Sequence, residues 1–107
     1  MIDDSTLGGY LRKHERPPAF EGSDGAPYSA EVLVEEAPND DGCYGGAVLF
    51  VRWSPDGDRP IGHVESPTIT SGATPQDARD AVLALTLYRL KELLDAAIAV
   101  AAERPTW

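Results

Sequence analysis

The sequence has little of several residue types on which common protein chemistries depend. Cys43 is its only cysteine, so the chain can form no internal disulfide and no four-thiolate metal site. Nine lysines and arginines stand against eighteen aspartates and glutamates, which gives a net charge of −9. No basic run exceeds Arg12–Lys13, whereas proteins that bind nucleic-acid phosphates usually cluster Lys and Arg. We therefore expect no nucleic-acid binding by the chain itself.

Long apolar runs are also missing. No stretch approaches the ~20 uncharged residues that a membrane span requires. The first ten residues contain no basic segment followed by an apolar run, which a secretory signal would need. These absences predict a cytoplasmic protein that does not enter a membrane. The length of 107 residues favours one domain with a modest core.

The stretch from Thr74 to Glu103 is the strongest structural signal in the chain. Thr74 is a natural helix N-cap, Pro75 suits the first helical position, and Asp77 lies where a carboxylate favours the positive end of a helix. The residues that follow are mostly Ala, Leu, Glu, Arg and Lys, without Gly or internal Pro before Arg104 and Pro105. The pattern predicts one long helix over residues 74–103.

The strands are expected before this helix. Tyr28–Glu36 alternates apolar and polar residues, Tyr44–Trp53 is apolar on both parities, and Ile61–Ser66 is a shorter strand that Thr68–Thr70 could continue. The turns between them are rich in Pro, Asp, Asn and Gly. Three strands followed by a long helix predict an α+β domain over residues 26–107. In this domain a three-stranded antiparallel sheet is covered by one C-terminal helix.

Residues 1–25 are interpreted as an arm that packs loosely on this domain. A short helix is expected over residues 5–14, although Gly8 and Gly9 weaken helical propensity there. Trp107, which follows Pro105, either docks on the body of the domain or is free.

Catalytic and metal-binding signals are weak. Cys43 and His63 would make a nucleophilic pair only if their strands were neighbours, and no oxyanion-hole loop accompanies them. The acidic turns 39–41 and 56–58 lack calcium-loop spacing, so ordinary turn chemistry explains them better. We expect no cofactor, no metal and no enzymatic activity. A small-ligand or enzymatic module near Cys43 and His63 stays open as an alternative, as does an oligomeric structural protein.

Two motifs resemble the HicB-like family of antitoxins. In that family a strand is followed by an Asp/Gly-rich turn, a strand beginning Gly-Tyr, a further strand and a Gly-x-Thr-x-x-(Glu/Asp)-Ala helix opening. Here residues 40–46 read DDGCYGG and residues 72–78 read GATPQDA, with Asp77 in place of the more usual Glu. The resemblance covers about residues 28–98. No DNA-binding segment follows the helix, and the loop 54–60 is longer and more polar than in the family.

The resemblance implies a protein-interaction module that neutralises or binds a small basic protein. The residues expected to carry such a contact are acidic and have no Lys or Arg among them: Glu31, Glu35, Glu36, Asp40 and Asp41. The order helix, three strands, helix is also similar to the double-stranded-RNA-binding domain. That family places lysines at the start of its last helix, whereas residues 76–80 here read QDARD, with a net negative charge.

Helix 74–103 carries a heptad stripe that continues beyond the reach of a small sheet. An exposed apolar strip is rarely tolerated by a soluble monomer, so the spacing predicts a homodimer or a higher even oligomer. The predicted interface consists of Leu87, Leu90, Leu94, Ala97, Ile98 and Ala101. The alternative is a monomer in which the arm, through Leu7, Tyr10, Leu11 and Phe20, folds over this strip.

Overall fold

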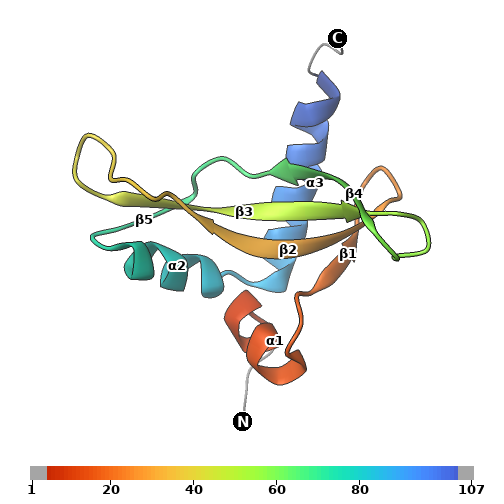
Figure 1. Cartoon of the computed structure of the whole chain (residues 1–107), viewed down its shortest axis with the longest axis horizontal. Helices are drawn as coiled ribbons and strands as arrows, with labels where there is room; N and C mark the ends of the chain where they lie inside the picture. The colour runs from red at the N-terminus through yellow and green to blue at the C-terminus, as the bar shows by residue number, and fades with distance from the viewer. Residues whose placement is uncertain (1–4, 104–107) are drawn as a thin grey trace.

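The computed structural model describes residues 5–103 as three helices and five strands (Figure 1). Trp107 and the expected helix stop at Arg104 and Pro105 lie outside the described residues. The elements in chain order are α1 (Leu7–His14), β1 (Ala19–Glu21), β2 (Pro27–Val34), β3 (Tyr44–Trp53), β4 (Pro60–Glu65), β5 (Thr70–Gly72), α2 (Pro75–Leu83) and α3 (Leu87–Glu103).

The strands form one antiparallel sheet in the order β1-β2-β3-β4, and β5 pairs with the beginning of β3. The predicted α+β class and antiparallel sheet are confirmed, but the expected number of strands was wrong, because the sheet has five. The two additional strands, β1 and β5, are three residues each. Three residues are too few for an alternating pattern to stand out in a sequence.

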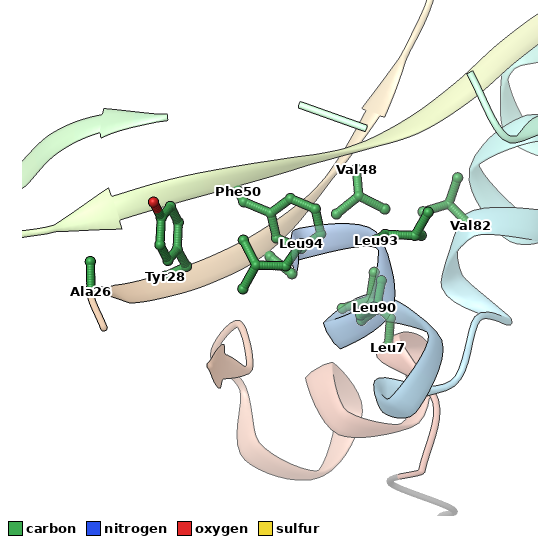
Figure 2. Close-up of a cluster of buried hydrophobic side chains, with 10 residues drawn as sticks. Leu7, Ala26, Tyr28, Val48, Phe50, Val82, Leu90, Leu93 and Leu94 are labelled. Atoms are coloured by element: carbon green, nitrogen blue, oxygen red, sulfur yellow. The ribbon is translucent and has the colours of Figure 1, made fainter. Parts of the chain in front are cut away.

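All three helices contribute to a core on one face of the sheet (Figure 2). The sheet provides alternate residues of β2 and β3, because successive side chains of a strand point to opposite faces. Fully buried members of this core are Tyr28, Val48, Phe50, Val82, Leu90, Leu94 and Leu7. Within residues 5–103 no helix is both long and apolar enough to cross a membrane.

The prediction of a single helix over residues 74–103 was wrong, because α2 ends at Leu83 and α3 begins at Leu87. Thr86 begins α3 as an N-cap, and its hydroxyl accepts a hydrogen bond from the Arg89 N–H at 3.1 Å. The N-terminal segment forms hydrogen bonds with backbone groups at the break. The Leu7 N–H donates to the Leu85 carbonyl, and the Leu87 N–H donates to the Ser5 carbonyl. The break lets the two shorter helices pack against different strands, α2 against β2, β3 and β5 and α3 against β4.

The segment at the N-terminus is not the loosely packed arm that the sequence suggested. Leu7 is completely buried beside Leu90, and Leu11 and Phe20 pack against the same cluster. β1 extends the sheet by pairing with β2. The expected short helix over residues 5–14 is present as α1. Thus the part of the apolar helix strip around Leu90 is covered by the chain's own N-terminal segment.

α2 begins as its sequence predicts and packs very closely on the sheet. Thr74 is its N-cap and accepts a hydrogen bond from the Asp77 N–H at 3.1 Å, with Pro75 in the first turn. Two glycines permit the close approach. A Cβ on Gly72 would lie 2.5 Å from the Ala78 nitrogen, and one on Gly46 would lie 3.0 Å from the Ala78 carbonyl oxygen.

Candidate partner-binding surface

The face of the sheet opposite the core is not covered by any of the three helices. The pairing register places Leu33, Leu49 and Val51 on this outer face, because their neighbours Val32, Val48 and Phe50 point into the core. Leu33 is 37% exposed, and Leu49 and Val51 are half-buried. A partly exposed apolar strip on an open sheet face is typical of a surface that receives a partner.

Trp53 forms one end of this outer face. Its indole N–H donates to the Ser29 hydroxyl across the strand pair at 2.9 Å. The hydrogen bond fixes the ring beside Val51, and half-buried Trp side chains of this kind are frequent anchors in interfaces. We therefore define the outer sheet face by its apolar residues, which are Leu33, Leu49, Val51 and Trp53.

Charge on the outer sheet face is of one sign. Glu31 and Glu65 lie on either side of Leu49 in the register, and Glu35 follows β2 along the same face. None of the outward-facing positions of β1 to β5 is Lys or Arg. His63, 3.8 Å from the Glu65 carboxylate, is the nearest basic group on β4. An apolar centre with an acidic rim favours a basic partner.

The five acidic residues predicted to contact a partner are all exposed, but they do not form one compact cluster. Glu31 lies on the outer sheet face, and Glu35 accepts a hydrogen bond from the Thr68 hydroxyl at 3.2 Å. Asp41 accepts a hydrogen bond from the Cys43 N–H in the turn between β2 and β3. Glu36 and Asp40 belong to the same connection. The apolar residues beside Glu31 were missed, although Tyr44–Trp53 is apolar on both parities.

Cys43 and His63 are far apart, which removes the geometric basis for a nucleophilic pair. His63 is opposite Val51 on β3, whereas Cys43 precedes the first residue of the same strand. The separation along β3 is roughly 25 Å at about 3.3 Å per residue. Among residues 5–103 no group of three His, Cys, Asp or Glu side chains could hold a metal ion.

Most of the residues predicted for an oligomer interface point into the chain's own core. Leu90 and Leu94 are completely buried, and Ala97 is 6% exposed. Leu87 and Ile98 are partly buried against the same cluster, and Ala101 is exposed. Up to Ala97, the heptad spacing therefore reflects burial of the helix within one chain. Of the predicted interface residues only Ala101 is exposed, and its neighbour Val100 is 53% exposed.

A polar cluster at one end of the sheet was not anticipated from the sequence. The Tyr28 hydroxyl donates to Asp24 at 2.8 Å, and Arg52 lies 3.6 Å from the same carboxylate. Burial, together with the hydrogen bond to Asp24, raises the pKa of Tyr28 to about 12. Burial alone would raise the pKa of Asp24, but hydrogen bonds from the Ala26 N–H and Tyr28, with the Arg52 charge, lower it. Both groups keep one protonation state at neutral pH, so the cluster fixes the β1–β2 turn and is unsuited to proton transfer.

Comparison of the chain with protein-family models, with curated proteins and with solved structures finds no match.

Proposed function

We propose that the chain is a non-enzymatic protein-interaction module that binds a small basic protein on its outer sheet face. The observation that carries the proposal is the apolar strip bordered by Glu31, Glu35 and Glu65 without Lys or Arg on the face. A net charge of −9 would steer a basic partner toward this surface. The resemblance of residues 40–46 and 72–78 to HicB-like antitoxins supports neutralisation of such a partner as its role.

The matched pair Leu33→Lys and Tyr88→Lys tests this proposal. Both side chains are exposed, at 37% and 77%, and both changes replace an apolar group by one positive charge. Leu33 lies on the outer sheet face, whereas Tyr88 lies on α3, on the helical side. A tagged chain would be used to capture proteins from its native host at low salt, and the affinity of a captured basic protein would then be measured.

We expect Leu33→Lys to weaken that binding about tenfold, a loss of about 1.4 kcal/mol, and Tyr88→Lys to leave it nearly unchanged. Failure to capture any basic protein at low salt would contradict the proposal. Equal effects of the two substitutions would also contradict it, because the outer sheet face would then have no special role.

Self-association stays a second proposal, in a form changed by the burial of Leu90 and Leu94. A homodimer or higher even oligomer would use the exposed end of α3, around Val100 and Ala101, where small side chains permit close approach. Light scattering of the intact chain over a range of concentrations measures this directly. A constant monomer mass would refute it.

A further inference from the structure

The free edge of the sheet carries a second surface, separate from the outer sheet face. β4 ends the sheet order, and in the described part of the chain no strand pairs with its other side. Ser66 donates its N–H to the Val48 carbonyl at 2.9 Å, in register with β3 and β4. In an antiparallel pair such bonds alternate, so every second residue directs its backbone groups outward. The N–H and C=O groups of His63 and Glu65 therefore point away from β3, whereas a register shift interrupts the alternation at Ile61.

α3 provides a floor beneath this edge. Figure 1 shows that α3 crosses the strands at a steep angle and that its C-terminal turns project past β4. Lengths explain the projection: 17 residues of helix span about 26 Å, whereas four strands about 4.8 Å apart span about 15 Å between the outermost axes. A strand added to β4 would rest on Val100 and Ala101, so its inner side chains would leave water.

Two hollows lie between the β4 edge and the helix. One, of about 220 Å³, is lined by His63, Val64 and Glu65 with Ala97, Val100 and Ala101. The other, of about 530 Å³, continues along the β4–β5 connection past Pro67 and Ile69. Its helical wall includes Leu93 and Ala96. The larger hollow, whose lining is mostly apolar, offers room for apolar side chains on the inner side of an added strand, whereas the lining of the smaller hollow is mostly polar.

We infer that this edge takes an extended segment of the basic partner by strand addition, with apolar side chains toward α3 and Lys or Arg outward. The outward backbone groups of His63 and Glu65 specify an extended occupant. The outward side chains of an added strand would lie near Glu65, whose side chain is 51% exposed, on the acidic side of the sheet. The inference rests on the proposed function for the basic character of the partner.

A second copy of this chain suits the edge less well than a basic segment. It would bring another net charge of −9 to an acidic surface. Pairing of two β4 strands would also place the α3 helices of both copies beneath the same short strands, because Ala97 and Ala101 lie against His63 and Glu65 in every copy. A separate extended segment introduces neither problem.

Amide hydrogen exchange with a defined peptide tests the inference. The probe is a synthetic peptide of about eight residues in which Val and Lys alternate, and its control has the same residues in two blocks. We expect the alternating peptide to slow exchange about tenfold at His63 and Glu65. Gly62 and Val64, whose amides already bond to β3, should change little. The block peptide should give no such alternation.

Substitutions at His63 separate the backbone from the side chain. His63→Pro removes the outward N–H, while the neighbouring bonds of β4 to β3 come from Gly62 and Val64, and proline is tolerated on edge strands in such positions. His63→Ala removes only the side chain. We expect peptide binding to be lost in His63→Pro and retained in His63→Ala, with the protection of Gly62 and Val64 confirming the fold. Equal binding by both variants would overturn the inference.

A second pair of variants, on α3, tests the inference without introducing a proline into the strand. Val100→Arg and Ala99→Arg add the same charge at neighbouring exposed positions, but only Val100 lines the hollows. Only Val100→Arg should weaken the peptide, by about tenfold. Protection of the same amides by rising protein concentration without peptide would assign the edge to a second copy and overturn the inference. Leu33→Lys should leave the edge protection intact, so failure at the outer sheet face is distinguishable from failure here.

Discussion

Leu7→Ala tests whether the N-terminal segment belongs to the cooperative core. Leu7 is completely buried beside Leu90 and Val82, so its truncation removes apolar contacts and leaves a cavity. Such changes typically cost 2–5 kcal/mol, a large part of the ~5–15 kcal/mol by which a domain is stable. We expect the free energy of unfolding to fall by about 3 kcal/mol, which would lower the urea midpoint by roughly 1–3 M.

Leu33→Ala is the matched control for this measurement. It deletes the same atoms from a side chain that is 37% exposed on the outer sheet face, so its loss should be below about 1 kcal/mol. Far-UV circular dichroism and tryptophan fluorescence should report one coincident transition for both variants. If Leu7→Ala were no more destabilising than Leu33→Ala, the segment would lie outside the cooperative core and our description of the core would be refuted.

Three other changes probe particular contacts. Thr86→Ala should lower the free energy of unfolding by about 1 kcal/mol in urea because α3 loses its N-cap, whereas Thr86→Ser should retain most of that stability. Equal losses in the two variants would contradict the role of Thr86 as the cap. Gly72→Ala should cost about 1–3 kcal/mol, since its Cβ would lie 2.5 Å from the Ala78 nitrogen, while Gly62→Ala, with nothing within 4 Å, should be nearly neutral. Tyr28 has a folded-state pKa of about 12, above the ordinary 10.0, so its contribution is fully present below pH 10 and is lost as the pH rises toward 12. Urea unfolding between pH 8 and pH 11 should show this extra loss in the native chain but not in Tyr28→Phe.

The elements with strong local signals were predictable from the sequence. Thr74 and Pro75 identify the start of α2, and the alternation over Tyr28–Glu36 identifies β2. The break at Thr86 was not predicted, although Thr is a good N-cap, because the surrounding Ala and Leu residues are equally compatible with a continuous helix. What decides between the two is tertiary: backbone bonds from Ser5 and Leu7, some eighty residues away in the chain.

The candidate surface was predictable only in part, for a related reason. The acidic residues Glu31 and Glu35 are visible in the sequence, but the face on which each apolar residue lies depends on the register and on where the helices pack. Leu33 is apolar where the alternation of β2 would place a polar residue, and it is an exposed member of the outer sheet face. Conversely, Leu90 and Leu94 were predicted to form an interface between chains, with cover by the N-terminal segment as the alternative, and both are buried inside the chain.

The pairing of α1 with the start of α3 has a consequence for synthesis of the chain. Thr6 bridges to Thr86, and Leu7 belongs to the same core cluster as Leu90, so the core joins two segments that are synthesised about eighty residues apart. All five strands are synthesised before α3 exists to cover them. Until then Phe50 and Val48 would face water on the growing chain, and the open edge of β4 would have no helix beneath it. Folding should therefore wait for the synthesis of α3, and chains that stop before α3 should be prone to aggregation.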